Sequence, residues 1–502
     1  MPAIAGIDIG SNAIRLIIAN ADQNRRMEVV ERAREAVRLG QDVFSNDQIS
    51  EKMMDGALKA LERFKGLMNN YGVVLSKTVG TSALRDAKNG AQFVARAKKN
   101  LGIDVEIIGG EEEARLINLA VQNKMDTRQK TALLVEIGGG SVEITLTDNE
   151  KIASSVSLDI GTVRLICELK GKKTDEKEFA QMVQEYVGGL KKDFKKAIGP
   201  KKIDLCVGTG GNIETMGGLC KDEMGGDSNE VIPLPLLNSL VKKLQNLSFE
   251  ERIREIGLRP DRADVILPAA IVLQRIAKLA EVENVHVPYV GLRDGVLLDL
   301  WGGIYAGTKG IQREQALSSA RLIGKKYQYD ESHAETVARL SGMLFDATKE
   351  LHGLNGEHRV LLEAAALLHD VGSFIGVSKH HKHTYYLLSS TPIIGLNKEQ
   401  QAVVANIARY HRMASPTERH EGFAALSTAG KAATTKLSAL LRLADAMDTE
   451  HEGIVKKFRL DLTKSKASLA LEGSGDLLIE KWKLARKCDL FEEVFQLKLV
   501  LE

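Results

Sequence analysis

The chain has 502 residues, of which 44% are hydrophobic and 27% charged, and its net charge is +2. This length predicts roughly three domains of about 150 residues, and the composition is ordinary for a globular protein. The near-zero charge gives no overall attraction to nucleic acid or to an anionic membrane, and no apolar run approaches the ~18 residues of a membrane-spanning helix. Four scattered cysteines, with no secretory leader, indicate a reduced, cytoplasmic protein.

The first stretch with chemical content, residues 4–16, has the sequence IAGIDIGSNAIRL. An apolar strand ends at an acid, a glycine turn follows, and a second strand pattern carries an arginine. Glycine turns let backbone N–H groups approach an anion closely. The polar and glycine residues of this stretch are therefore candidates for phosphate and metal binding: Asp8, Gly10, Ser11, Asn12 and Arg15.

Strands and helices alternate as far as residue 127. Strands are expected at 3–8, 13–19, 27–33, 73–79 and 105–108, and helices at about 50–71 and 91–100. Such alternation indicates an α/β layer with sites at the strand ends. Two segments that follow strands, GTSALRDA with Arg85 and GGEEEARL with Glu113, are therefore of interest. The glutamates of the second segment also have a purely structural interpretation, because acids in a first helical turn suit the helix dipole.

Residues 133–145, LLVEIGGGSVEIT, repeat the strand–turn–strand pattern of the first stretch. Carboxylates suit a hard divalent cation, so the pattern predicts a phosphate held by a metal and a glycine turn, with a plain glycine-rich hairpin as the alternative. The residues concerned are Glu136, Gly138, Gly139, Gly140, Ser141 and Glu143. The duplication predicts two similar lobes, residues 1–127 and 128–308, facing one cleft, which is the plan of the actin-like ATPase folds.

A third glycine turn precedes a predicted helix in the second lobe. Helix N-termini after such turns bind phosphate readily, which makes the turn residues further phosphate-binding candidates: Gly208, Thr209, Gly210, Gly211 and Asn212. The chain has neither a P-loop motif nor a G-x-G-x-x-G fingerprint at a strand–helix junction, which argues against a P-loop or a Rossmann nucleotide site.

Ten of the eleven histidines lie between His333 and His451. This shift in composition marks a separate module, which we expect to be helical over residues 309–452 and to be followed by a small α+β domain over residues 453–502. Imidazole and carboxylate suit first-row metals, so four residues form a candidate metal set: His333, His369, Asp370 and Asp445. The alternative is a structural domain without metal.

Together the motifs GIDIGSNAIRL, GTSALRDA, IIGGEEEARL and LLVEIGGGSVEIT resemble the exopolyphosphatase/guanosine pentaphosphate phosphatase (Ppx/GppA) family. The resemblance spans essentially the whole chain. It implies an α/β fold with a two-lobed, actin-like (ribonuclease H-like) ATPase-type core, followed by an all-α HD-type domain and a small α+β C-terminal domain. It also implies a homodimeric hydrolase that removes the terminal phosphate of inorganic polyphosphate or guanosine pentaphosphate, with Mg²⁺ or Mn²⁺.

The resemblance assigns roles to individual residues. Glu113 matches the catalytic carboxylate that orients or deprotonates the attacking water, and Arg85 matches an arginine that contacts phosphate. Asp8 and Glu143 match the acids of the two phosphate loops and are candidate metal ligands. Glu136 is a third candidate ligand, at a position where the family more often has Asp, and Asn212 stands in a turn where a hydroxyl residue is common.

Three other functions remain open from the sequence. An actin-fold ATP phosphotransferase would share the two phosphate turns but would need an acceptor pocket with its own base. The HD-type module would itself be a metal phosphohydrolase if its metal set is occupied. A sensor would bind guanosine alarmones or polyphosphate without turnover, although Glu113 and both phosphate turns favour catalysis.

Overall fold

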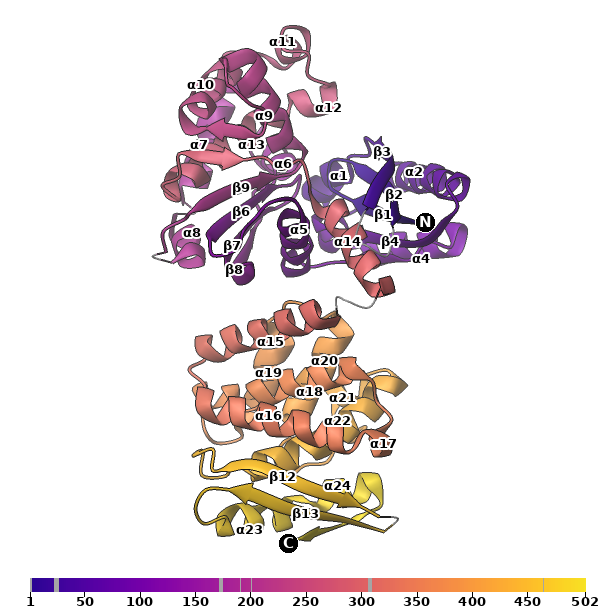
Figure 1. The fold of residues 1–502 in the computed structure, drawn as a ribbon. Helices are drawn as coiled ribbons and strands as arrows, with labels where there is room; N and C mark the ends of the chain where they lie inside the picture. The colour runs from indigo at the N-terminus through magenta and orange to yellow at the C-terminus, as the bar shows by residue number, and fades with distance from the viewer. Residues whose placement is uncertain are drawn as a thin grey trace. The chain divides into compact units, whose positions relative to one another are not determined.

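A computed structural model describes residues 2–21, 27–170, 175–189, 191–199, 201–305, 309–463 and 465–502. The chain forms two compact units, Met1–Thr308 and Lys309–Glu502 (Figure 1). The last three residues of the predicted second lobe, 306–308, lie outside the described residues. The predicted boundaries after residues 127 and 452 fall inside these units and stay predictions.

The first sheet of unit 1 has five strands in the order β3-β2-β1-β4-β5. Its central strand, β1, is buried along its whole length, as expected for a strand that is covered on both faces. The expected strands and helices of this lobe are found to within two residues at each end. The strands are β1 (Ala3–Ile9), β2 (Ile14–Ala21), β3 (Met27–Glu35), β4 (Val73–Gly80) and β5 (Val105–Ile107).

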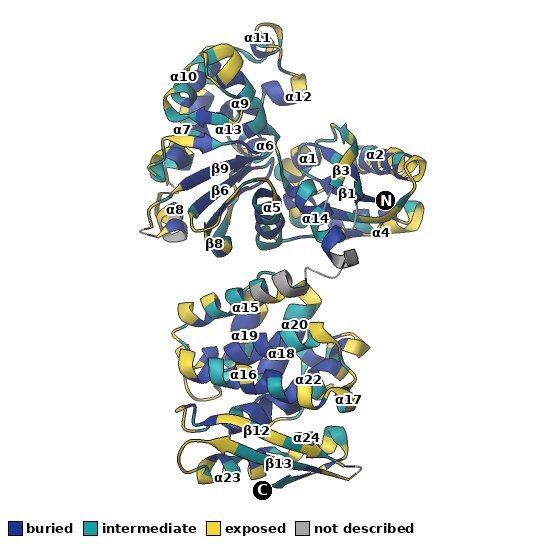
Figure 2. Cartoon of the chain, in the orientation of Figure 1, coloured by how far each residue is buried: buried dark blue, intermediate teal, exposed yellow. Residues whose placement is uncertain are grey.

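The second sheet has the order β10-β11-β9-β6-β7-β8, so its strands β8-β7-β6-β9-β11 repeat the first sheet's order. The register repeats as well, because Asp8 faces Arg15 across β1 and β2 while Glu136 faces Glu143 across β6 and β7. Figure 2 shows the central strands of this sheet, β6 and β9, as buried. The strands are β6 (Thr131–Ile137), β7 (Val142–Asp148), β8 (Lys151–Leu158), β9 (Leu205–Thr209), β10 (Val231–Pro233) and β11 (Asn284–His286).

The helices of unit 1 cover these sheets, and α5 and α14 pack against each other. Helix α13 has its apolar residues buried, which agrees with a core helix rather than a membrane span. The helices are α1 (Leu39–Asn46), α2 (Glu51–Asn70), α3 (Ser82–Asp86), α4 (Gly90–Leu101), α5 (Gly110–Lys124), α6 (Thr162–Leu169), α7 (Glu176–Gly189), α8 (Lys191–Ile198), α9 (Gly211–Met224), α10 (Leu234–Gln245), α11 (Phe249–Arg254), α12 (Pro260–Ala263), α13 (Ile266–Leu279) and α14 (Leu292–Tyr305).

Unit 2 is a helical bundle joined to a three-stranded sheet of order β12-β13-β14. One hydrophobic core includes residues from both the helices and the sheet. Its elements are α15 (Lys309–Lys326), α16 (Glu331–Ala347), α17 (Lys349–His352), α18 (Gly356–Leu368), η1 (Val371–Phe374), α19 (His380–Ser390), α20 (Lys398–Arg409), α21 (Glu421–Ala424), α22 (Thr428–Ala446), β12 (Val455–Leu462), β13 (Lys466–Gly473), α23 (Leu478–Lys487), α24 (Asp489–Phe495) and β14 (Lys498–Leu501). Among the described residues of the whole chain, no helix combines the length and apolar character that a bilayer crossing needs.

Candidate functional site

The β1–β2 turn and the β6–β7 turn, which the sequence duplication relates, lie against each other. A Cβ atom on Gly139 would come 3.0 Å from the Cβ of Ser11, and a Cβ atom on Gly140 would collide with the hydroxyl of Ser82. Ser11 and Ser82 are themselves joined by a hydrogen bond of 2.9 Å between their hydroxyls. Glycine at these positions therefore permits a close approach of backbone that no other residue would allow.

The β6–β7 turn keeps three of its amides free of protein acceptors, while the amide of Gly138 donates to the carbonyl of Ser141. The carbonyl oxygens of Gly138, Gly139 and Gly140 accept hydrogen bonds of 3.1, 2.8 and 3.2 Å from amides at the start of α6. Among the residues that the structure describes, the amides of Gly139, Gly140 and Ser141 donate to no protein acceptor. Successive free N–H groups at a turn form an anion-binding concavity, so this turn has the groups that a phosphate needs.

Three buried carboxylates meet beside this turn, and we call them the carboxylate cluster: Glu113 of α5, Glu136 of β6 and Glu143 of β7. One oxygen of each lies within 4.8 Å of the others. In each of the three, Oε2 is buried without a hydrogen-bond partner. Buried charges are stable only when they are paired or coordinate a metal, and oxygen ligands suit a hard divalent cation. The cluster therefore fits a divalent metal ion.

The cluster perturbs its own acidity. Burial, with the neighbouring charges of Glu143 and Asp8, raises the pKa of Glu136 to about 8. Burial and the charges of Glu143 and Glu136 also raise the pKa of Glu113 well above its ordinary value, although Arg85 opposes the rise. Burial raises the pKa of Glu143 too, but the hydroxyl of Ser141 donates a 2.6 Å hydrogen bond to this carboxylate and favours its ionised form. Without a cation, the cluster therefore holds protons.

Asp8 lies outside this three-carboxylate group. Its Oδ2 accepts an ion-paired hydrogen bond of 3.3 Å from Arg15, and its Oδ1 is buried without a partner. The predicted metal set combines Asp8 with Glu136 and Glu143, whereas the three acids that lie within reach of one ion are Glu113, Glu136 and Glu143. The predicted catalytic carboxylate, Glu113, and two predicted metal ligands, Glu136 and Glu143, thus share one location.

A cavity of about 50 Å³ lies between the two turns. Most of the predicted site residues line it: Asp8, Gly10, Ser11, Asn12, Arg15, Glu113, Glu136, Gly138, Gly139, Ser141, Gly210, Gly211 and Asn212. The predicted residues outside this lining are Arg85, Gly140, Glu143, Gly208 and Thr209. Of these, Arg85 donates a 3.1 Å hydrogen bond to the carbonyl of Ile108, and a Cβ atom on Gly208 would press on Ile213 and Val285, so packing explains that glycine.

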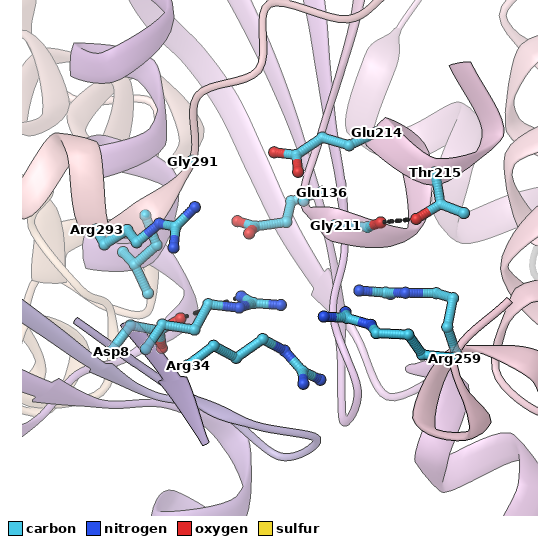
Figure 3. A pocket seen from close by; sticks show the side chains of 13 residues that line it. Asp8, Arg34, Glu136, Gly211, Glu214, Thr215, Arg259, Gly291 and Arg293 are labelled. Carbon is cyan, nitrogen blue, oxygen red and sulfur yellow. Dashed lines mark hydrogen bonds and ion pairs between the residues drawn. The ribbon is translucent and has the colours of Figure 1, made fainter. Parts of the chain in front are cut away.

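A larger cavity of about 170 Å³ adjoins the first and shares Asp8, Arg15 and Glu136 with it. Figure 3 shows the guanidinium groups of Arg34, Arg259 and Arg293 around this cavity, together with the carboxylates of Glu136 and Glu214. We call it the arginine pocket after the five arginines that line it: Arg15, Arg34, Arg259, Arg262 and Arg293. Five guanidinium groups against three carboxylates make the lining cationic.

These arginines are held close enough to oppose one another. Burial and the charges of Arg15 and Arg34 lower the pKa of Arg262 to about 10. Burial, followed by the charge of Arg15, also lowers the pKa of Arg293. Arg262 is positioned by a short hydrogen bond to Oδ1 of Asn212, which gives this departure from the family's hydroxyl residue a structural role. Because an anion would relieve the repulsion, the pocket suits a polyanionic ligand.

Only one of the four additional pocket arginines gave a signal in the sequence. Arg293 lies in the glycine-flanked GLRDG segment that follows β11, whereas Arg34, Arg259 and Arg262 belong to no recognised motif.

A sequence model of the Ppx/GppA phosphatase family matches residues 16–302, and a model of Ppx/GppA phosphatase domain III matches residues 316–493. The chain belongs to the Ppx/GppA phosphatase family.

Curated relatives extend over most of the chain. A guanosine-5'-triphosphate,3'-diphosphate pyrophosphatase from Photobacterium profundum is 26% identical over 452 residues, covering 88% of this chain and 86% of the relative. A protein of the same name from Vibrio campbellii is 26% identical over 450 residues, with the same shares of both chains.

Solved structures of the Ppx/GppA family cover the chain in part. A crystal structure of an exopolyphosphatase from Cytophaga hutchinsonii is 29% identical, covers 60% of this chain and 98% of its own, and has a TM-score of 0.56. The Aquifex aeolicus member of the family is 28% identical, covers 60% of this chain and 97% of its own, and has a TM-score of 0.51.

Membership of the Ppx/GppA family confirms the predicted two-lobed, actin-like ATPase-type core and identifies the chain as a phosphoanhydride hydrolase of a divalent-metal phosphatase family. The C-terminal match is to the family's own domain III. The HD-type assignment of the helical region therefore stays a prediction.

Proposed function

We propose that this protein removes the terminal phosphate from guanosine pentaphosphate or inorganic polyphosphate by attack of water on a phosphoanhydride. The observation that carries the proposal is the carboxylate cluster, which lies beside a turn with free amides and next to the arginine pocket. The names of the relatives, a guanosine pentaphosphate pyrophosphatase and an exopolyphosphatase, support both substrates. The cytoplasmic location rests on the scattered cysteines, and the homodimer rests on the family resemblance alone.

In this proposal the two cavities divide the substrate between them. The terminal phosphate enters the small cavity, where the amides of Gly139, Gly140 and Ser141 donate hydrogen bonds to its oxygens. The remaining anionic part lies in the arginine pocket, where guanidinium groups bind phosphate oxygens in a bidentate manner. Phosphoryl transfer depends mainly on positioning and electrostatic stabilisation, and these two anion-binding regions would supply both.

Glu113 accepts the proton of the attacking water. Its Oε2 is buried without a partner, and its raised pKa brings its proton affinity closer to the range in which a general base is efficient. Glu136 and Glu143, with Oδ1 of Asp8 nearby, would hold Mg²⁺ or Mn²⁺ through buried oxygens that lack other partners. When bound, such an ion would neutralise charge on the transferred phosphate and keep the cluster ionised.

The test is phosphate release in the presence of Mg²⁺ from long-chain polyphosphate, guanosine pentaphosphate and ATP. Glu113→Gln should lower kcat by on the order of 10²- to 10⁴-fold, because the amide cannot accept the proton. Glu111→Gln is the matched control from the same helical turn and should retain full activity. The ratio of kcat/KM for the two proposed substrates then assigns the physiological one.

Other outcomes would contradict the proposal. Turnover that survives Glu113→Gln would show that another group is the base or that another part of the chain is the catalyst. Binding of both substrates without phosphate release would make the protein a sensor. Phosphate transfer from ATP to an added acceptor, without hydrolysis of the other two compounds, would make it a phosphotransferase.

A further inference from the structure

Six side chains from five helices of unit 2, or from the residues that directly follow them, converge on one region, and we call them the histidine–aspartate centre. His333 comes from α16, the neighbours His369 and Asp370 follow α18, and Asp445 comes from α22. The other two members, His380 at the start of α19 and His411 just after α20, are absent from the metal set predicted from the sequence. His333, His369 and His411 are at most 2% exposed.

Three of these side chains form a first triangle of ligand atoms. Nε2 of His333 lies 3.2 Å from Nε2 of His369, and these nitrogens lie 3.7 and 3.6 Å from Oδ1 of Asp445. With metal–ligand bonds of about 2.1 Å, adjacent ligand atoms of one ion are roughly 3.0 to 3.5 Å apart. The triangle therefore has nearly the dimensions of one face of a coordination shell.

A second triangle adjoins the first. Nε2 of His380 lies 3.1 Å from Nε2 of His411, and Oδ1 of Asp370 lies 3.0 and 3.3 Å from these two nitrogens. The other oxygen of Asp370 lies 3.6 Å from Nε2 of His369, so this carboxylate stands between the two triangles. Oδ1 of Asp370 is buried, and its contacts with the two imidazoles are not aligned as hydrogen bonds.

The second nitrogen of every histidine in the centre is engaged by an acceptor. Nδ1 of His333 lies 2.8 Å from Oδ2 of Asp448, whose other oxygen accepts a 2.7 Å hydrogen bond from a backbone amide. The other three contact backbone carbonyls: His369 with Ala366 at 2.7 Å, His411 with Ala408 at 2.7 Å, and His380 with Val377 at 3.1 Å. Each Nδ1 must donate to such an oxygen, so each ring, when neutral, directs the lone pair of its Nε2 into the centre.

Lys487 pairs with Oδ2 of Asp445 and leaves Oδ1 directed into the centre. Four Nε2 lone pairs of neutral imidazoles and the inward-facing oxygens of two carboxylates repel one another unless metal cations or protons lie among them. Metal-binding histidines regularly donate their other N–H to a carboxylate or a backbone carbonyl, which fixes the tautomer and the ring orientation. All four histidines of the centre have this arrangement. Nothing comparable exists in the carboxylate cluster of unit 1, which offers oxygen alone.

We propose that the histidine–aspartate centre binds two first-row divalent cations. His333, His369 and Asp445 hold one ion, His380 and His411 hold the other, and Asp370 lies between them. Imidazole with carboxylate suits Mn²⁺, Fe²⁺ and Zn²⁺, whereas Mg²⁺ prefers oxygen. This site shares no residue with the proposed phosphatase site, so either proposal can be wrong while the other holds.

Metal counting on the full-length protein tests the proposal with Mn²⁺ as the probe. The chelator-treated protein is loaded with Mn²⁺ in the presence of excess Mg²⁺, which occupies the oxygen sites. It is then desalted, and its bound Mn²⁺ is measured by inductively coupled plasma mass spectrometry. The wild type should retain about two equivalents of Mn²⁺. His333→Gln and His411→Gln should each retain about one fewer, and His358→Gln, a histidine outside the centre, should match the wild type. Equal Mn²⁺ contents in all four proteins would overturn the proposal.

Electron paramagnetic resonance of the wild type needs no substitution and so does not depend on the folding of a variant. Ions of a two-metal site lie about 3.5 to 4 Å apart, and two Mn²⁺ ions at that separation give an exchange-coupled spectrum. The coupled spectrum should persist in Glu136→Gln, which alters only the unit 1 cluster. A spectrum of isolated bound Mn²⁺ ions, or a spectrum with no signal other than that of free Mn²⁺, would overturn the proposal. It would show that the histidines form a protonated polar network instead.

Discussion

The carboxylate cluster makes the stability of the metal-free protein depend on pH in an unusual direction, and Glu136→Gln tests it. The ordinary pKa of a glutamate is 4.5, and the environment of Glu136 raises it to about 8. Between these two pH values the folded state keeps a proton that the unfolded state releases. The free energy of unfolding therefore falls as pH rises through this window. The stabilisation from the proton on Glu136 is present in full only below about pH 4.5.

The size of the effect follows from the same two values. One proton held by the folded state but not by the unfolded state lowers the free energy of unfolding by about 1.4 kcal/mol per pH unit. From pH 5 to pH 8 this amounts to roughly 4 kcal/mol. For a unit of this size, in which 1 kcal/mol shifts Tm by about 2 °C, the melting temperature should fall by roughly 8 °C.

Thermal unfolding in EDTA from pH 5 to pH 8 measures this fall. The glutamine side chain of Glu136→Gln is uncharged at every pH, so the wild-type protein should lose stability relative to this variant as pH rises. Glu62→Gln, an exposed position on α2, should follow the wild type. Adding Mg²⁺ should raise the wild-type Tm more at pH 8 than at pH 5, because the ion competes with protons for the cluster. Parallel curves for the wild type and Glu136→Gln would refute this account of the cluster.

Two further substitutions test the surroundings of the cluster. Arg262→Gln should raise KM for polyphosphate by roughly tenfold or more with a smaller change in kcat, since it removes a charge-assisted contact worth about 1.5 to 3 kcal/mol. The control, Arg254→Gln on the exposed side of α11, should leave KM unchanged in the same assay. Gly140→Ala should lower the free energy of unfolding by roughly 1 to 3 kcal/mol and abolish most phosphate release, because the added Cβ collides with Ser82. The control is Gly66→Ala, whose added Cβ has no atom within 4 Å, and it should unfold no more easily in denaturant than the wild type. Normal activity of Gly140→Ala would contradict the close packing of the two turns.

Local patterns in the sequence were sufficient for the strands and for both phosphate turns. Alternation, apolar runs and glycine positions are properties of neighbouring residues. The duplicated pattern around Asp8 and Glu136 predicted two lobes, because each copy folds into the same strand–turn–strand unit. Burial of β1 and β6 follows from their apolar sequences, so the strand ends were predicted to within two residues in the first lobe.

Only the tertiary structure decided which acids share one location. Glu113 belongs to helix α5, whereas Glu136 and Glu143 belong to the strands β6 and β7 that follow it. Acids in a first helical turn are equally explained by the helix dipole. The fold brings its carboxylate to Glu136 and Glu143, and burial of all three creates their raised pKa values. Acidity of this kind depends on exclusion of water and on through-space charge, neither of which a spacing in the sequence records.

The arginine pocket and the histidine–aspartate centre show the same limit more strongly. Arg34 of β3 and Arg262 of α12 belong to no motif, because an arginine in a strand or a short helix has the same local sequence whether its side chain faces water or a cavity. His380 stands beside His381 in the sequence, which does not specify the direction of either side chain. His411 joins the centre because α19 and α20 bring it, with His380, to Asp370. The sequence by itself determined the elements and the two turns, because these depend on local backbone preferences. The tertiary structure decided the composition of each site, because long side chains from distant elements meet only after the chain has folded.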